Sequence, residues 1–113
     1  MEPNYNPRLD PAIKYIQDNP HEMPSMTDMA KLCGLSNSYF SRLFHKELGV
    51  NFVAYLNNKK IADACRILER NSSVSVMELS RDLGFSDASY FIRIFRRITG
   101  TTPYAYRKKY YRR

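Results

Sequence analysis

Residues 25–49 read SMTDMAKLCGLSNSYFSRLFHKELG, and residues 75–100 repeat the pattern as SVMELSRDLGFSDASYFIRIFRRITG. The two stretches align at an offset of 50 up to Ser36, and at an offset of 51 after one inserted residue near Ala88. A repeat of this quality indicates that the chain builds one supersecondary unit twice. Two copies are too few for a solenoid, so we expect the function to need a pair of similar elements.

Each copy carries the signals of two helices joined by a turn of about three residues. A serine followed three residues later by an acid predicts a capping box, and a glycine suits the left-handed position that ends a helix. The predicted capping boxes pair Ser25 with Asp28 and Ser75 with Glu78, and the first helices are predicted to end at Gly34 and Gly84. The second helices are predicted to be capped by Ser36 and Ser86, with Asp87 as a further part of the last cap. Helix, glycine-containing turn and helix form the helix-turn-helix pattern, which therefore occurs twice.

Three further helices complete the chain. Asp10-Pro11, or Asn6-Pro7, opens a first helix, and Thr102-Pro103 opens a last one. Between the two copies, residues 51–70 predict one uninterrupted helix. Its expected apolar positions are Val53, Leu56, Ile61, Ala64, Cys65 and Leu68.

The resulting fold class is all-α, with seven helices forming two helix-turn-helix lobes joined by a long linker helix. We expect a single bilobed domain over residues 1–113, with lobe 1 at about 7–50, the linker at about 51–70 and lobe 2 at about 74–113. At about 1.5 Å per residue the linker is about 27 Å long, close to the roughly 34 Å between successive major-groove faces of DNA.

Charge is distributed unevenly along the chain. Lys and Arg number 18 against 11 acidic residues, and residues 51–113 hold 13 of the basic and only 5 of the acidic side chains. This asymmetry points to a polyanionic partner, either nucleic acid or an anionic membrane surface, while a merely solvated basic surface stays open. No apolar run approaches the roughly 18 residues of a membrane span, and no signal-peptide core is present, so we expect a soluble, cytoplasmic protein without a membrane partner.

The residues give no sign of catalysis, of a metal site or of a cofactor. Cys33 and Cys65 form no CxxC pair, and His21 and His45 add no metal-ligand spacing. We expect both cysteines to be buried free thiols in a reducing compartment. Because no paired carboxylates, nucleophile-base set or phosphate loop is present, we expect no enzyme activity.

The second helix of each copy separates into an apolar and a polar face at 100° per residue. The predicted inward residues are Phe40, Leu43 and Phe44 in the first copy and Phe91, Ile94, Phe95 and Ile98 in the second. The predicted outward residues of the first copy are Ser38, Arg42 and His45, flanked by Tyr39, Ser41 and Lys46. Those of the second copy are Ser89, Arg93 and Arg96, flanked by Tyr90, Ile92 and Arg97. A small hydroxyl residue lets the backbone approach DNA, and arginine can bond guanine O6 and N7 together. Ile92 is either a contact for a thymine methyl or a tolerated surface residue, and both interpretations stay open.

These motifs resemble the DNA-binding domain of the AraC/XylS family of bacterial transcription regulators, from about residue 7 to 110. The resemblance is carried by MAKLCGLS from Met29, YFSRLF from Tyr39, LSRDLGFSD from Leu79, YFIRIFRRITG from Tyr90 and TPYAYR from Thr102. The family implies that each lobe places its second helix in one of two successive major grooves. It also implies an asymmetric, bent site of about 20 base pairs.

The resemblance assigns DNA-contacting roles to particular positions. The base-reading set is Ser38, Ser41 and Arg42 in lobe 1 and Ser89, Ile92 and Arg93 in lobe 2. The expected phosphate set is Ser36, Tyr39, His45, Lys46, Ser86, Tyr90, Arg96 and Arg97.

We therefore expect a sequence-specific regulator of transcription that binds double-stranded DNA, with RNA polymerase as a further partner. A sequence-indifferent nucleic-acid-binding or architectural protein is the alternative, and a helical protein-interaction module is a third class. As this chain alone the protein is expected to be a monomer, and as a fragment of a longer protein it could be part of a dimer.

Overall fold

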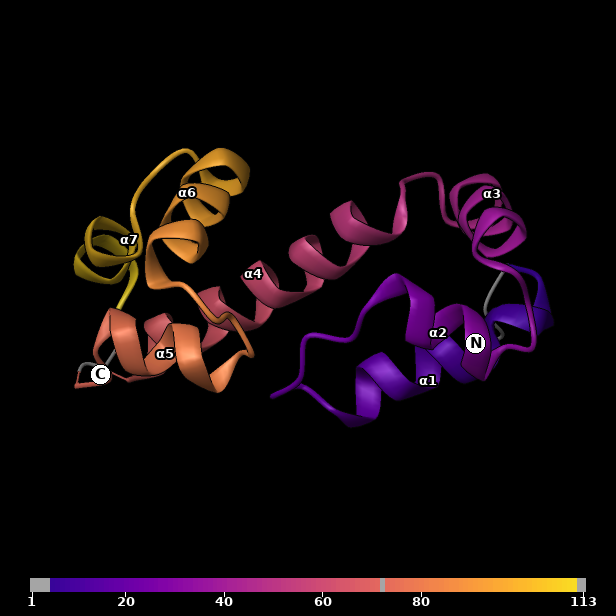
Figure 1. Cartoon of the computed structure of the whole chain (residues 1–113). Helices are drawn as coiled ribbons and strands as arrows, with labels where there is room; N and C mark the ends of the chain where they lie inside the picture. The colour runs from indigo at the N-terminus through magenta and orange to yellow at the C-terminus, as the bar shows by residue number, and fades with distance from the viewer. Residues whose placement is uncertain (1–4, 72, 112–113) are drawn as a thin grey trace. The chain divides into compact units, whose positions relative to one another are not determined.

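The computed structural model describes residues 5–71 and 73–111, and in this part of the chain it contains seven α-helices, one short 3-10 helix and no strand. The all-α class is therefore confirmed. In chain order the elements are η1 (Pro7–Leu9), α1 (Asp10–Asp18), α2 (Met26–Leu32), α3 (Asn37–Leu48), α4 (Phe52–Arg70), α5 (Val76–Asp82), α6 (Ala88–Thr99) and α7 (Pro103–Tyr110). Figure 1 labels the helices α1 to α7.

The chain divides into two compact units, and the boundary between Leu56 and Asn57 falls inside α4. Phe52 and Leu56, at the start of α4, belong to the buried core of the first unit. Ile61 and Leu68 are buried in the part of α4 that belongs to the second unit. The central helix is therefore shared between two cores, instead of being a spacer outside them.

Three phenylalanines form the centre of the first unit. The rings of Phe40 and Phe44, on α3, lie 5.6 Å apart, and Phe52 packs edge-on against them at 5.8 and 5.5 Å. Tilted and edge-to-face geometries of this kind are favourable for aromatic pairs. The inward face expected for the first repeated helix is therefore confirmed, and Phe52 is a core residue that the apolar spacing of the sequence did not indicate.

Aromatic rings also connect the elements of the second unit. Phe91 lies 5.0 Å from Phe85 and 5.9 Å from Phe95, and Phe95 packs edge-on against Tyr106 of α7 at 5.5 Å. The Tyr106 hydroxyl donates a hydrogen bond to the Glu69 carboxylate on α4. Burial and this bond raise the pKa of Tyr106 above its ordinary value, and the hydrogen bond links α7 to α4.

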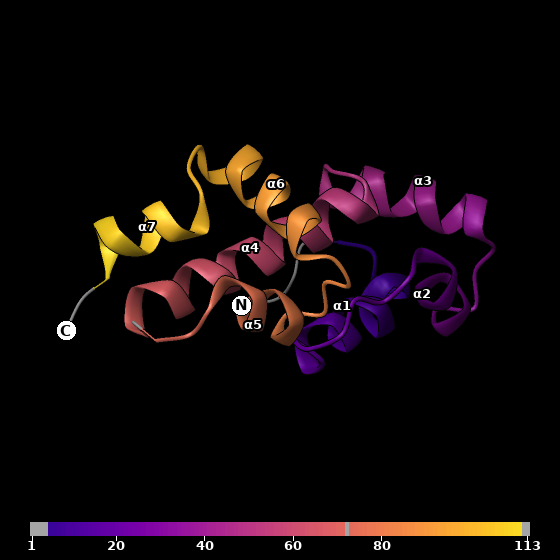
Figure 2. The same ribbon diagram turned by 60° about the vertical axis from the view of Figure 1, so that its left-hand side comes forward.

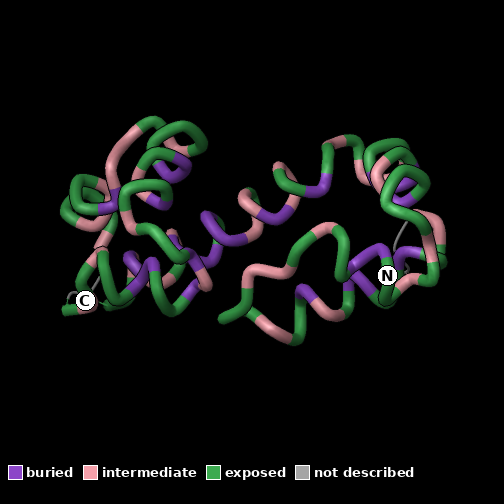
Figure 3. Tube along the Cα trace, viewed as in Figure 1, coloured by how far each residue is buried: buried purple, intermediate pink, exposed green. Residues whose placement is uncertain are grey.

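Burial alternates along the helices that carry the repeat, and Figure 3 shows buried and exposed positions following one another along the tube. Two predicted core residues are nevertheless exposed. Val53 is 58% exposed because the apolar stripe at the start of α4 runs through Phe52 and Leu56, one residue away. Ile98 is 42% exposed because it lies in the last turn of α6, beyond the buried Phe95.

Both cysteines are free thiols, as expected, but each is partly rather than fully buried. Burial raises the pKa of Cys33 and of Cys65 above the ordinary thiol value. Among the helices of the described residues, none is long and apolar enough to cross a membrane.

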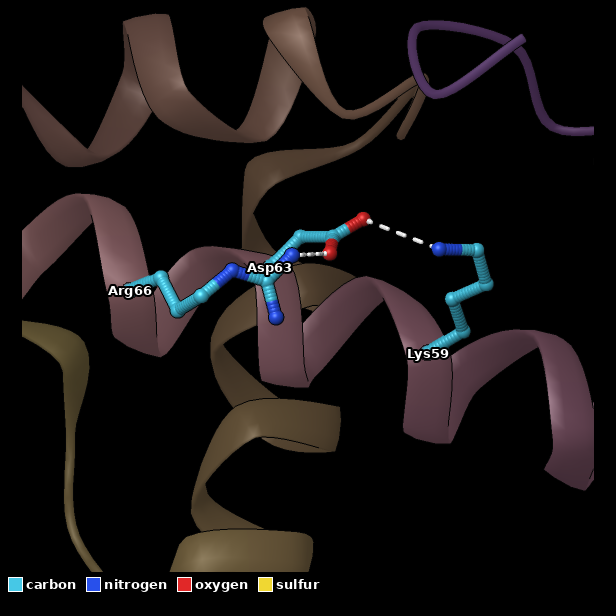
Figure 4. Close-up of polar contacts among 3 residues, drawn as sticks. All are labelled: Lys59, Asp63 and Arg66. Atoms are coloured by element: carbon cyan, nitrogen blue, oxygen red, sulfur yellow. Dashed lines mark hydrogen bonds and ion pairs between the residues drawn. The ribbon is translucent and has the colours of Figure 1, made fainter. Parts of the chain in front are cut away.

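A buried carboxylate joins two basic side chains along α4. Figure 4 shows Asp63 between Lys59 and Arg66, one turn away on either side. The Lys59 Nζ lies 3.7 Å from Asp63 Oδ2, and Arg66 bonds the other carboxylate oxygen. The Asp63 side chain is only 11% exposed, so these ion pairs offset the cost of burying its charge.

Candidate nucleic-acid interface

Both helix-turn-helix segments begin with a serine cap, and the cap of the second is a full capping box. Ser75 Oγ accepts from the Glu78 amide at 3.0 Å, and Glu78 Oε1 accepts from the Ser75 amide at 3.2 Å. At the start of α2, Ser25 Oγ accepts from the Asp28 amide at 3.1 Å, which is one half of such a box. The aspartate side chain is shorter than that of glutamate, so it reaches back less far toward the Ser25 amide.

The turn of each motif passes through a glycine in the left-handed conformation. Gly34 has φ of 70° and Gly84 has φ of 94°, values that a side chain would make costly. The connection that follows is short, so the second helix of each motif starts three or four residues after its glycine. Figure 2 shows α2 leading directly into α3, and α5 into α6.

The second helix is capped differently in the two copies. Ser36 Oγ accepts from the Tyr39 amide at 3.2 Å and caps α3, as predicted. The cap of α6 is Asp87, which accepts from the Ser89 amide at 2.9 Å, and the prediction that Ser86 is the cap is wrong. The residue inserted in the second copy moves the helix start one position further, so Ser86 lies outside the capping position.

On α3, the predicted DNA-facing side chains lie on the exposed side of the helix. Ser38 and Arg42 are exposed, Ser41 is half-buried, and a surface hollow is lined by these three together with Met26 and Asn37. The exposed members of the predicted phosphate set on and before this helix are Ser36, Tyr39, His45 and Lys46.

On α6, the corresponding face carries more basic side chains than on α3, and Ile92 takes the place of the polar Ser41. Ser89 and Arg93 are exposed, whereas Ile92 is half-buried. The exposed members of the predicted phosphate set here are Ser86, Tyr90, Arg96 and Arg97. A second surface hollow lies at the start of α6, and its lining includes Met77, Ala88 and Ser89.

Two tyrosines at the starts of α3 and α6 are held by residues distant in sequence. Arg8 donates from Nη1 to the Tyr39 hydroxyl at 3.4 Å, and its guanidinium carbon lies 6.0 Å from the ring centroid. In the second unit, Asn57 Nδ2 donates to the Tyr90 hydroxyl at 3.4 Å, and Arg93 lies 5.7 Å from that ring.

Arg8 and Asn57 were not among the residues predicted to contact DNA, because nothing local in the sequence links them to the repeated helices. Arg8 and Tyr39 are 31 residues apart, and Asn57 and Tyr90 are 33 apart. No signal in the single sequence could have found either contact. Within the described residues, no group of three or more His, Cys, Asp or Glu side chains could hold a metal ion.

Known proteins share this pattern over most of the chain. A family model described as a helix-turn-helix domain matches residues 29–109. The chain is 34% identical to the regulatory protein PocR of Salmonella typhimurium over 105 residues, which are 93% of this chain and 34% of PocR. It is 30% identical to the arabinose operon regulatory protein of Escherichia coli over 110 residues, which are 95% of this chain and 37% of that protein. This chain thus spans about a third of the length of these relatives.

A solved structure gives the same result for the fold. The DNA-binding domain of the global transcriptional factor AdpA, solved in complex with a target DNA, superposes with a TM-score of 0.85 and 28% identity. The match covers 91% of this chain and 92% of that one. The duplicated motif, the family model and these relatives agree, and the chain belongs to the AraC/XylS family as a helix-turn-helix DNA-binding domain of its transcription regulators.

Proposed function

We propose that this chain binds double-stranded DNA sequence-specifically and that α3 and α6 each read one major groove of an asymmetric site. The observation that carries the proposal is the repeated exposed face, in which a serine and an arginine one turn later stand opposite buried phenylalanines. A helix of this kind can enter the major groove while its other side stays in the core.

Charge supports DNA as the partner. The chain carries a net charge of +7, and the basic surplus lies in residues 51–113. Exposed Arg96 and Arg97 follow the reading face of α6, and exposed His45 and Lys46 follow that of α3. Basic side chains in these places can contact the phosphates that border a groove, and such contacts fix orientation without reading sequence.

The two helices differ, and this difference supports an asymmetric site. Ser41 can hydrogen-bond a base edge, whereas Ile92 at the corresponding position can offer only apolar contact. Arg93 lies against the ring of Tyr90, while Tyr39 is contacted by Arg8. We therefore expect the half-site bound by α6 to contain a thymine methyl where the half-site bound by α3 presents a polar group.

Selection of bound sequences from randomised duplexes tests the proposal. The expected result is two short preferred blocks about one helical turn apart and different in sequence. A single block, or two identical blocks, would contradict the proposed asymmetric reading. Equal affinity for all sequences with a steep salt dependence would instead identify a sequence-indifferent nucleic-acid-binding protein.

A further inference from the structure

A hydrogen bond joins the starts of the two helices of the first motif. Asn37, the first residue of α3, donates from Nδ2 to the Thr27 hydroxyl oxygen on α2 at 3.1 Å. Both residues are exposed, so the bond does not satisfy a buried group. Asn37 also lines the surface hollow that contains Ser38, Ser41 and Arg42.

We propose that Asn37, oriented by Thr27, is a further base-reading residue of the first motif and that it recognises adenine. The inference rests on the proposed function, because it adds a residue to the same reading face. Neither Asn37 nor Thr27 belongs to the base-reading or phosphate sets assigned from the family resemblance.

The amide of Asn37 retains the groups that adenine requires. Its Nδ2 carries two hydrogens, of which one is used by Thr27, so one N–H donor and the Oδ1 acceptor remain. In the major groove, adenine presents an acceptor at N7 beside a donor at N6, the complement of this pair. Because the bond to Thr27 restricts rotation of the amide, less side-chain entropy is lost when the base is bound.

The second motif shows that the fold does not need this polar pair. The first helices of the motifs correspond at an offset of 50 and the second helices at 51, so Thr27 corresponds to Met77 and Asn37 to Ala88. Met77 and Ala88 also line a hollow beside Ser89, but neither side chain offers an amide or hydroxyl group. Since the same motif forms without the pair, its presence in the first motif is better explained by ligand recognition than by folding.

The test measures base preference at every position of the selected site for the unaltered chain and its variants. Asn37→Ala is expected to lower the preference for adenine at one position of one block by about 5- to 150-fold, with the other block unchanged. Replacing that adenine by 7-deazaadenine, which lacks the N7 acceptor, should weaken binding of the unaltered chain and leave Asn37→Ala unaffected.

Asn37→Asp provides a variant that should not weaken the fold, because a carboxylate at the first turn of a helix is stabilising. An aspartate can accept from the cytosine amino group but cannot donate to adenine N7. The expected result is a change of the preferred base at the same position from adenine to cytosine. An unchanged adenine preference would overturn the proposal.

Thr27 acts by positioning the Asn37 amide, and substitutions of Thr27 test this role separately. Thr27→Val removes the hydroxyl with little change of shape and should reduce the adenine preference at the same position, whereas Thr27→Ser should retain it. In the Asn37→Ala background, Thr27→Val should have no further effect on that position. An additive loss would show that Thr27 acts independently of Asn37 and would contradict the proposed orientation.

The outcomes separate this inference from the proposed function. If the unaltered chain prefers no sequence, both fail. If it prefers two blocks and Asn37→Ala leaves every position unchanged, or weakens binding to all sequences equally as loss of a phosphate contact would, only the inference fails.

Discussion

Asp63 carries a buried charge whose removal should lower the stability of the fold. Its side chain is 11% exposed and bonds Lys59 and Arg66. Asp63→Asn keeps the shape but leaves two cations near a neutral amide, so the free energy of unfolding should fall by about 1 to 3 kcal/mol. Urea unfolding followed by circular dichroism measures the change.

The exposed pair of Lys14 and Asp18 provides the matched control. These side chains lie 3.2 Å apart and are 78% and 58% exposed. Asp18→Asn should therefore change the free energy of unfolding by less than about 0.5 kcal/mol. Equal effects of the two substitutions would contradict the role assigned to burial at Asp63.

The cysteines give a pH-dependent prediction. Burial raises the pKa of Cys33 and Cys65, so at a given pH the folded chain holds less reactive thiolate than the unfolded chain. The Cys33→Ser and Cys65→Ser variants each retain one cysteine, so the alkylation rate of each variant reports a single thiol. For both variants, the midpoint of the alkylation rate against pH should lie at higher pH in the folded protein than in urea. A folded midpoint at or below the unfolded one would contradict the burial effect.

Predictions for single residues succeeded where periodicity was strong and failed at helix ends. The buried stripe of Phe40, Phe44, Phe91 and Phe95 followed from spacing alone. The exposure of Ile98 could not be predicted from periodicity, because Ile98 lies on the same side of α6 as the buried Phe91 and Phe95. It is exposed because the core ends before the last turn of the helix. The roles of the DNA-facing residues remain predictions.

At the level of elements, the start of α6 is the informative case. The sequence offers two adjacent capping residues, Ser86 and Asp87, and the structure uses Asp87 because the inserted residue moves the helix start. Boundaries of this kind depend on how the turn packs, which a single sequence does not reveal. The extent of α4 was predicted to within one residue, as 51–70 against the observed Phe52–Arg70, although the apolar spacing misplaced its buried stripe at the first turn.

Capping of α6 can be tested by a pair of substitutions. Asp87→Ala removes the acceptor for the Ser89 amide and should lower the free energy of unfolding by about 0.5 to 2 kcal/mol. Ser86→Ala, one residue earlier, should change it by less than about 0.5 kcal/mol. Chemical unfolding of both variants measures the difference, and a larger loss for Ser86→Ala would show that the helix starts one residue earlier.

For the whole molecule, the repeat in the sequence predicts two similar modules, and the chain folds into two compact units with the same motif. What the repeat could not predict is that Phe52 of α4 packs in the core of the first unit, because the rings that cover it belong to Phe40 and Phe44 on α3. The asymmetry of the modules is the feature on which the proposed function depends most. The faces proposed to read DNA share serine and arginine but differ at Ser41 and Ile92.

The central claim is that the two modules read different parts of one site. The most direct test compares base preferences of Arg42→Ala and Arg93→Ala with those of the unaltered chain on a randomised duplex library. Each variant should lose preference in one block only, a different block for each, at a cost of about 1 to 3 kcal/mol on the preferred site. Loss of preference at the same positions in both variants, or an equal loss on all sequences, would contradict the claim.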